Sequence, residues 1–445
     1  MTSPIHAAPA PVSLSTAFWY WLKLGFISFG GPAGQIALMH AELVERRRWI
    51  SEQRFLHALN YCMLLPGPEA TQLAVYIGWL MHQTRGGIMA GTLFVLPSLL
   101  ILIALSWIYM AFGALPAVAA ILYGIKPAVV AIVLSAAWRI ATRSIRNASL
   151  VAIALAAFLA IALFHLPFPL IVLGAGALGM LGGRLRPDQF QVGGKRPDAL
   201  ASHGPALIDD NTPTPPHARF AWTRLLTVAG TGAGLGLAGW LLLAAWSGAA
   251  SPLAQMGWFF SKAALLTFGG AYAVLPYVYQ GGVEHFHWLN AAQMMDGMAL
   301  GETTPGPLIM IVAFVGFVAA WSHALFGSHL LLAGAAGACV ATFFTFLPSF
   351  VFILAGGPLV ESTRDNLRMT APLTAISAAV VGVIASLALF FGQPVFWVEA
   401  PVPHWDLAAI AISAAACVAL FKFKAGTIPV IFACAASGLV LSYLH

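Results

Sequence analysis

Long apolar segments, separated by short polar stretches, run through most of this chain. Several segments reach 18 residues or more, the length that a helix needs to cross the hydrocarbon core of a membrane. The pattern predicts an all-α polytopic membrane protein with about thirteen apolar segments. The predicted segments are approximately 16–42, 52–82, 87–112, 116–138, 148–165, 167–183, 223–247, 253–281, 290–321, 328–356, 370–392, 405–421 and 426–444.

The two halves of the chain repeat one pattern of residues. KLGFISFGG at 23–31 resembles KAALLTFGG at 262–270, and Pro-Gly-Pro at 66–68 falls on Pro-Gly-Pro at 305–307 with the same shift. Further along, Leu-Pro-Ser at 96–98 falls on Leu-Pro-Ser at 347–349 after one change in length. Ordered matches of this kind predict a duplication. The single segment between the copies turns the second copy over, which predicts the inverted-topology repeats typical of secondary transporters.

These patterns divide the chain into five parts. Residues 1–15 are rich in proline, alanine and serine and predict a disordered tail. Residues 184–222 are polar, proline-rich and basic, which predicts a flexible cytoplasmic linker loop. The other parts are a first transporter repeat at 16–183, a connecting transmembrane helix at 223–247 and a second transporter repeat at 248–445. Counting outward from the linker places the N-terminus in the cytoplasm and the C-terminus outside.

Composition supports the membrane class and excludes several others. The 445 residues are 60% hydrophobic and 8% charged, whereas soluble domains carry about 25% charged residues. The net charge of +6 comes from basic residues gathered in loops, which indicates membrane orientation and not nucleic-acid binding. The four cysteines lie singly in apolar segments, so we expect no cofactor and no metal site.

The basic triplet Arg46-Arg47-Arg48 leaves two topologies open for the first two segments. If both segments span the membrane, the triplet lies outside, against the positive-inside rule. If both are re-entrant hairpins, with arms of about 12–16 residues that are too short to span, the triplet returns to the cytoplasm. We favour the hairpins.

Four breaks lie at equivalent places in the two copies. They are FGGP at 29–32, LPGP at 65–68, FGGA at 268–271 and TPGP at 304–307. Proline and glycine disrupt a helix, and non-helical backbone at membrane depth persists only where it is buried in protein or lines a cavity. A half-helix that starts after a break offers unpaired amides and a partial positive charge. The breaks predict an anion site near the midplane, although helix kinks used for packing remain the alternative.

Charged residues accompany the breaks. Lys23 and Lys262 are equivalent, each seven residues before a Gly-Gly pair, and we expect them to offset the charge of a bound anion or to reach the headgroups. Glu69 follows the first Pro-Gly-Pro, and Glu302 precedes the second by three residues. Each carboxylate is a candidate for proton coupling, or a simple helix cap.

One further aligned position is ionisable in both copies. His57 falls on Asp296, and the pair suits a proton relay, although a membrane histidine is more often structural. Thr303 and Thr304 are candidate hydroxyl donors beside the second Pro-Gly-Pro.

The motifs FGGPAGQIALM, RRRWISEQRF, LPGPEATQLAVYIGW and HWLNAAQMMDGMALGETTPGP resemble the chromate ion transporter family in its two-domain, long-chain form. The resemblance covers residue 18 to the end. It implies a bacterial inner-membrane protein that exports chromate, confers chromate resistance and is driven by the proton motive force. The motif positions that it implies for the substrate site are Phe29, Gly30, Gly31, Pro32, Pro66, Gly67, Pro68, Phe268, Gly269, Gly270, Pro305, Gly306 and Pro307.

We therefore predict a secondary transporter, not an enzyme, whose partners are chromate, protons and the lipid bilayer. A general carrier for sulfate and other oxyanions is the nearest alternative, because chromate and sulfate are both tetrahedral dianions. An anion channel is a second alternative, since the same helix ends can line a pore. The oligomeric state is open, with a homodimer as one option.

Overall fold

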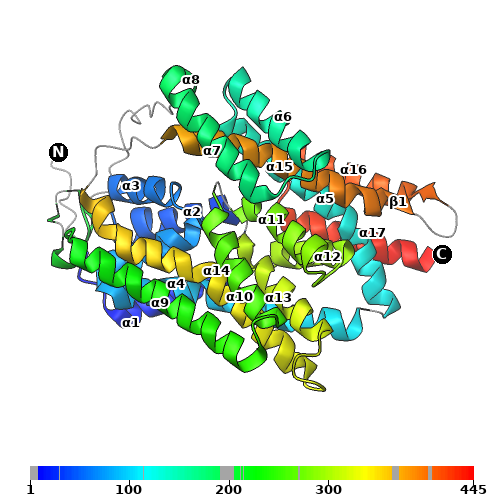
Figure 1. Ribbon diagram of the computed structural model, residues 1–445, viewed down its shortest axis with the longest axis horizontal. Helices are drawn as coiled ribbons and strands as arrows, with labels where there is room; N and C mark the ends of the chain where they lie inside the picture. Colours follow the sequence, from blue (N-terminus) through cyan, green and yellow to red (C-terminus); the bar gives the residue numbers. More distant parts are fainter. Residues whose placement is uncertain are drawn as a thin grey trace, which may run out of the picture.

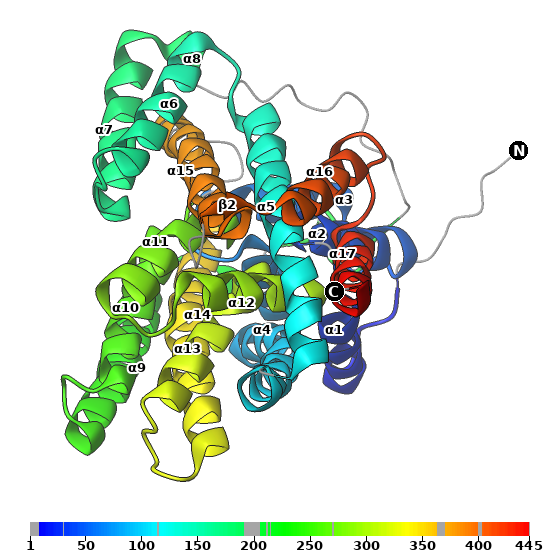
Figure 2. The ribbon, with the colours of Figure 1, turned by 90° about the vertical axis from the view of Figure 1, so that its right-hand side faces the viewer.

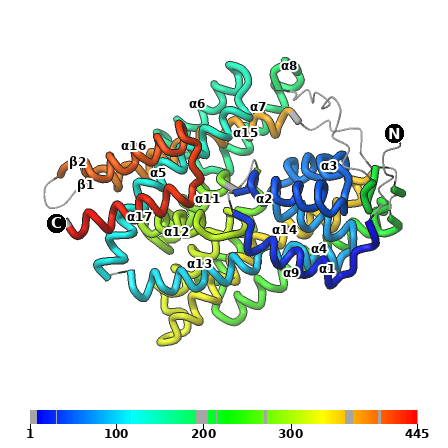
Figure 3. The backbone as a smooth tube through the Cα atoms, turned by 180° about the vertical axis from the view of Figure 1, so that it is seen from behind, coloured from blue at the N-terminus to red at the C-terminus, as the bar shows by residue number. Residues whose placement is uncertain are grey.

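The computed structural model describes residues 9–29, 31–113, 115–190, 205–210, 212–213, 215–268, 271–362, 370–398 and 403–444. These residues are almost entirely helical, apart from the two-residue strands β1 Trp397–Val398 and β2 His404–Trp405, which pair antiparallel. The molecule is elongated, with α1 and α3 at one end and the β1–β2 hairpin and α17 at the other (Figures 1 and 3).

The helices of the first half are α1 Leu14–Ile27, α2 Gly31–His40, the π-helix η1 Ala41–Arg46, α3 Glu52–Cys62, α4 Glu69–Phe112, α5 Pro116–Ser144, α6 Ala148–Ala162, α7 Phe168–Leu185 and α8 Pro187–Phe190. Those that follow are η2 Pro216–Ala218, α9 Trp222–Ser247, α10 Pro252–Leu266, η3 Ala271–Val274, α11 Leu275–Tyr279, the π-helix η4 Gln280–His285, α12 Ala291–Thr303, η5 Leu308–Met310, α13 Ile311–Ser322, α14 Leu330–Ser362, α15 Thr370–Phe396, α16 Leu407–Phe421 and α17 Thr427–Leu444.

Six helices in the described part of the chain are long and apolar enough to cross a membrane. Shorter apolar helices accompany them, so the predicted all-α multi-pass membrane protein is confirmed at this level. The count of thirteen segments stays a prediction. The six candidate spans are Glu69–Phe112, Pro116–Ser144, Phe168–Leu185, Trp222–Ser247, Leu330–Glu361 and Ala371–Phe396.

Helix α4 is a tight helical hairpin and not one straight rod. His82 and Gln83 have non-helical torsions, with φ of −135° and +56°. The part before this turn packs back against the part after it, where a Cβ atom on Gly78 would lie 2.5 Å from the Gly86 carbonyl oxygen. Helices α13 and α14 meet in the same manner through Gly316 and Gly337. Small residues are needed at both contacts because the two backbones nearly touch.

A second hairpin joins α3 to the start of α4, with its tip at Pro-Gly-Pro 66–68. The Tyr61 hydroxyl lies 3.5 Å from the Gly356 carbonyl oxygen, so α3 runs along α14. The tip at Gly67 lies against Ser349 of α14. Further along α4, Trp79 lies against Gly357, next to the Gly356 that α3 contacts. The chain therefore enters along α14, turns at the break and returns.

The corresponding segment of the second half forms a matching hairpin along α4. Asp296 of α12 bonds to Tyr109, the tip Gly306 packs against Ser98, and Phe314 of α13 returns to Tyr109 with ring centroids 5.3 Å apart. The two Pro-Gly-Pro breaks are therefore the tips of two hairpins, each supported by a long helix of the other half.

Helices α1 and α2 also turn back at their break. The Val12 carbonyl, just before α1, accepts a 2.8 Å hydrogen bond from His82, and Gly25 lies against Pro97 further along α4. After α2 and η1, the backbone at Trp49 bonds to Ile208 of the linker.

The two halves also share an unusual backbone conformation. It occurs at positions related by the same difference in residue number as the two Pro-Gly-Pro segments. The π-helices η1 and η4 occupy equivalent residues, and each is followed by a residue with φ of +53°, Arg48 and His287. The Trp49 amide donates to Leu43 O at 2.7 Å, and the Trp288 amide donates to Gly282 O at 2.8 Å.

The described part of the linker is anchored, although the sequence predicts a flexible loop. The amides of Leu207 and Ile208 donate to the carbonyls of Arg48 and Trp49, and the Ser51 amide donates back to Ile208. His217 Nε2 lies 3.1 Å from the Trp79 carbonyl oxygen. Burial of the His217 ring lowers its pKa, while the hydrogen bond to the Trp79 carbonyl acts in the opposite direction.

Helix α5 is central to the remaining helices. It packs against α12, α15, α16 and α17, and Figure 2 shows it between α15 and the α16–α17 pair. Gly124 of α5 meets Gly438 of α17 backbone to backbone, which brings these two helices close together.

Candidate functional site

The two Pro-Gly-Pro tips meet the ends of α1 and α10 in a paired arrangement. The Gly67 amide donates to the Thr267 carbonyl, and the Gly306 amide donates to the Ser28 carbonyl, both at 2.7 Å. Ser28 and Thr267 are equivalent positions in the two halves, as are Gly67 and Gly306. We call these four residues the break crossing. Each Pro-Gly-Pro break of one half is thus bonded to the residue before the Phe-Gly-Gly break of the other half.

Only glycine fits at the two tips of the crossing. Gly67 has φ of +121° and Gly306 has φ of +103°, a region that residues with side chains rarely adopt. A Cβ atom at Gly67 would also collide with Ser349 Oγ, and one at Gly306 would lie 2.7 Å from Ser98 Cβ. Backbone conformation and space therefore select glycine independently.

Helices begin directly after the breaks, as the proline positions predict. Pro68 is the N-cap of α4, Pro307 is the N-cap of η5, and Pro32 is the second residue of α2. The first turn of such a helix has amides without an intrahelical partner. The short helix η3 begins at Ala271, after the second Phe-Gly-Gly. Gly30, Gly269 and Gly270 lie outside the described residues.

Two fully buried glutamines brace the crossing. Gln35 Nε2 donates to the carbonyls of Gly306 and Ser28, and Gln72 Nε2 donates to the Pro66 carbonyl at 2.7 Å. Their Oε1 atoms have no partner among the described residues. The glutamines hold the irregular backbone of both breaks in place.

Two exposed arginines near the end of α5 contribute positive charge that acts on the two glutamates beside the breaks. Glu302 Oε1 accepts a 2.5 Å hydrogen bond from the Tyr272 hydroxyl, and Arg139 interacts electrostatically with both groups. Arg143, one turn further along α5, interacts with Glu69. The sequence did not single out these arginines as site residues, because they resemble loop charges that follow a predicted segment ending at residue 138. Helix α5 instead continues to Ser144.

The two predicted lysines are not brought to the crossing by any contact in the described residues. Lys23 and Lys262 are both exposed on their helices, and Lys262 Nζ lies 5.3 Å from the centroid of the Trp258 ring. Their role in offsetting anion charge stays a prediction, without a contact that supports it. A cation over an exposed ring is typical of a membrane-facing side chain.

Thr303 and Thr304 lie beside the crossing but use their hydroxyls within their own helix. Thr303 Oγ1 donates to Leu300 O at 2.9 Å, and Thr304 Oγ1 donates to Gly301 O at 3.0 Å. Phe29 is 38% exposed and Phe268 is half-buried, so neither ring is a core residue of the crossing.

Asp296 is a buried carboxylate that pairs with Lys126, a residue that the sequence did not single out and whose side chain is 30% exposed. Its Oδ2 accepts a 2.9 Å hydrogen bond from Tyr109 and lies 3.9 Å from Lys126 Nζ, while Oδ1 has no partner among the described residues. The residue is 2% exposed. The equivalent His57 instead approaches the Val360 carbonyl, at 3.1 Å. The lone lysine in the 116–138 segment was the available signal, since charges in membrane segments usually have a partner.

A buried charge pair lies between the first hairpin and α14. Arg54 Nη2 lies 3.9 Å from Glu361 Oε2, and the Tyr76 hydroxyl donates to Glu361. Arg54 and Glu361 are both under a tenth exposed. Buried pairs of this kind fix the register of the packed elements, here the hairpin against α14.

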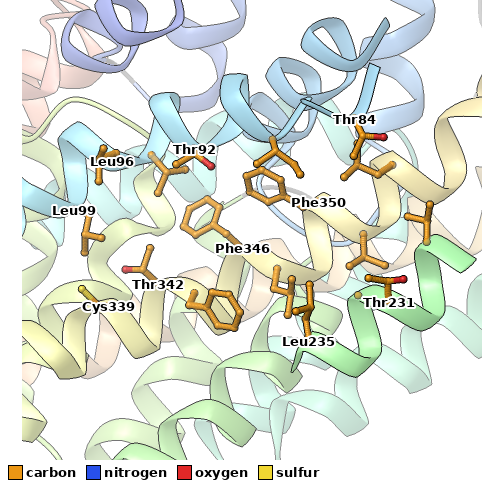
Figure 4. A pocket seen from close by; sticks show the side chains of 18 of the residues that line it. Thr84, Thr92, Leu96, Leu99, Thr231, Leu235, Cys339, Thr342, Phe346 and Phe350 are labelled. Atoms are coloured by element: carbon orange, nitrogen blue, oxygen red, sulfur yellow. The ribbon is translucent and has the colours of Figure 1, made fainter. Parts of the chain in front are cut away.

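Cavities next to α9 are apolar and contain none of the predicted site residues. One, of about 480 Å³, lies between α4, α9 and α14 and is lined by threonine, leucine, valine and phenylalanine side chains (Figure 4). Another, of about 860 Å³, lies between α9, α10 and α14. Walls of this composition suit lipid chains better than a dianion, because an unpaired charge is costly there.

Comparison with known proteins gives the family. The family model of the chromate transporters matches residues 15–180 and 254–439. A chromate transport protein of Cupriavidus metallidurans is 30% identical over 97% of this chain and 94% of its own length, and one of Pseudomonas aeruginosa is 33% identical over 87% and 83%. A probable chromate transport protein of Synechococcus elongatus is 30% identical over 88% of the chain and 87% of its length. No solved structure matches the chain. The resemblance predicted from the motifs is thereby confirmed, and the chain belongs to the chromate transporter family, a family of transporters and not of enzymes.

Proposed function

We propose that the protein is a secondary transporter that exports chromate across the bacterial inner membrane, driven by the proton motive force, with the anion bound at the break crossing. The paired bonds of Gly67 to Thr267 and of Gly306 to Ser28 carry this proposal. They place irregular backbone from both halves together inside a membrane protein, where such backbone needs a cavity or a protein partner.

In this proposal the two halves are inverted repeats. The recurring π-helices and matched hydrogen bonds support a duplication, and the antiparallel course of α4 and α14 at the crossing supports the inversion. The Pro-Gly-Pro hairpins and the α1–α2 turn are then re-entrant, with their tips at the midplane. The linker and the Arg46–Arg48 triplet lie on the cytoplasmic side together with the N-terminus.

A cysteine at Arg47 tests this topology. Because the neighbouring Arg48 and Trp49 bond to the linker, we expect Arg47→Cys to react with a membrane-impermeant thiol reagent only from the cytoplasmic side. The variant is made in a protein in which Cys339 has been replaced, because this native cysteine is exposed. Labelling of intact cells from outside would refute the re-entrant arrangement.

The chemistry of the crossing suits a small dianion. First-turn amides of α4, which begins directly after the first Pro-Gly-Pro break, supply hydrogen-bond donors and a partial positive charge. Arg139 and Arg143, exposed near the end of α5, add positive charge that acts on Glu302 and Glu69. Glu69 and Glu302 supply carboxylates that interact with the same arginines, so a proton on either one changes the charge available to the anion. This is the arrangement that coupling of anion and proton movement requires.

Transport assays in inverted membrane vesicles test the function directly. We expect uptake of chromate when a proton gradient is imposed, and loss of most uptake when it is collapsed. In Glu69→Gln or Glu302→Gln we expect chromate binding to persist while gradient-driven uptake falls at least about tenfold, since a neutral amide takes no proton.

The same assay separates the alternatives. Sulfate that competes at equal concentration would indicate a general oxyanion carrier, and flux far above carrier rates without a gradient would indicate a channel. Unchanged gradient-driven uptake in both glutamine variants would remove the two carboxylates from the coupling mechanism.

A further inference from the structure

Two buried serines, one from each half, face the Pro-Gly-Pro tips of the opposite half. A Cβ atom at Gly306 would lie 3.1 Å from Ser98 Oγ, and one at Gly67 would collide with Ser349 Oγ. Ser98 in α4 and Ser349 in α14 are equivalent positions, and both side chains are fully buried. Each serine follows a proline inside its long helix, Pro97 or Pro348.

The Ser98 hydroxyl has no hydrogen-bond partner among the described residues. Buried hydroxyls in helices usually bond to a carbonyl one turn earlier. Ser28 and Thr267 do so at the crossing, at 2.5 and 2.7 Å. Ser98 does not, so its donor stays available directly beside Gly306. A buried donor without a partner is costly unless a ligand or water uses it.

The Ser349 hydroxyl, in contrast, has one partner. Its Oγ accepts a long hydrogen bond, 3.5 Å, from Gln72 Nε2. No acceptor for its own hydrogen is found in the described part of the chain. Each tip therefore has a glycine with positive φ and a buried serine of the other half beside it, and the serine at the Gly306 tip is the one without a partner in the described residues.

We propose that Ser98 and Ser349 are the paired hydroxyl donors that hold the oxygens of a tetrahedral dianion at the break crossing. The inference rests on the proposed function, because it assigns residues to the same anion site. Chromate and sulfate oxygens are acceptors only, and hydroxyl bonds to charged oxygens are among the stronger hydrogen bonds. A donor from each half also lets the anion contact both halves, as a site between two moving units needs.

Equilibrium binding to the purified full-length protein tests the inference, with radiolabelled chromate as the probe and sulfate as a second probe. We expect Ser98→Ala and Ser349→Ala each to raise the Kd for chromate about tenfold or more, and the double variant about a hundredfold or more. Ser98→Cys, which keeps the shape of the side chain with a slightly larger atom but donates weakly, should behave like Ser98→Ala.

Thermal unfolding of the same variants separates binding from structure. Without ligand, Ser98→Ala should be as stable as the wild type or more stable, because it removes a buried donor that has no protein partner. Stabilisation by added chromate should shrink. Ser106→Ala is the matched control, since Ser106 is also fully buried, lacks a partner in the described residues and lies on α4 away from the crossing. It should bind chromate normally.

Wild-type affinity in both Ser98→Ala and Ser349→Ala would overturn the inference while leaving the proposed function intact. A wild-type protein that binds neither chromate nor sulfate would instead refute the anion site as a whole. Equal loss of affinity in Ser106→Ala would show that any buried serine of α4 matters, and would also count against the inference.

Discussion

Gly67→Ala and Gly306→Ala are each expected to abolish chromate transport and to lower thermal stability. Alanine in the left-handed region costs about 1–2 kcal/mol. The new methyl group also collides with Ser349 or Ser98, and overpacking typically costs about 1–3 kcal/mol more. Any shift that relieves the collision moves the hairpin tip and breaks its bond to Thr267 or Ser28. Uptake in vesicles and unfolding temperature in detergent measure the two effects.

Gly327→Ala is the matched control for these glycines. Gly327 also has a positive φ, +59°, but nothing lies within 4 Å of the position of its Cβ atom. It follows α13 in a turn away from the crossing. We expect only the cost of the backbone strain, about 1–2 kcal/mol, and normal uptake per folded molecule. Normal uptake in Gly306→Ala as well would mean that the break crossing is not part of the transport site.

Lys126→Met is expected to destabilise the protein and to stop gradient-driven uptake. It leaves Asp296 buried with the Tyr109 hydroxyl as its remaining partner among the described residues. Removing one partner of a fully buried ion pair typically costs about 3–5 kcal/mol, and we expect a smaller loss here because the lysine side chain is 30% exposed. The double variant Lys126→Met/Asp296→Asn removes both charges, so we expect most of the stability to return. If Asp296 carries a coupled proton, the double variant still binds chromate but its uptake no longer responds to the gradient.

An exposed ion pair provides the comparison for the Lys126 and Asp296 variants. Arg46 Nη1 lies 3.0 Å from Glu42 Oε2, with 77% of the arginine side chain exposed. Arg46→Met should cost no more than about 1 kcal/mol. Full gradient-driven uptake in the Lys126/Asp296 double variant would show that the pair only supports the packing of α5 against α12.

The distribution of apolar residues was sufficient to predict the class of the protein and the places where its helices break. Apolar runs of spanning length and a charged fraction of 8% are incompatible with a soluble fold. Pro-Gly-Pro disrupts helical backbone wherever it occurs, so the breaks at 66–68 and 305–307 followed from local chemistry alone. The shared shift between the two halves likewise depends only on the order of residues.

The sequence was less informative about side chains near the breaks. Lys23 and Lys262 lie at the right distance along the chain, yet both are exposed on the outer faces of their helices. Thr303 and Thr304 lie next to the crossing, yet their hydroxyls bond to their own helix. Distance along the chain predicts proximity to a break, but not the direction in which a side chain points.

Membrane class, helix breaks and the repeated motifs were determined by the sequence itself, because each depends on the properties of neighbouring residues. Which residues meet was decided only by the tertiary structure. Ser98 faces Gly306, and Lys126 pairs with Asp296, across separations that no local pattern encodes. The physical reason is that the hairpins pack against the long helix of the opposite half, and this packing between halves selects the buried face of each helix.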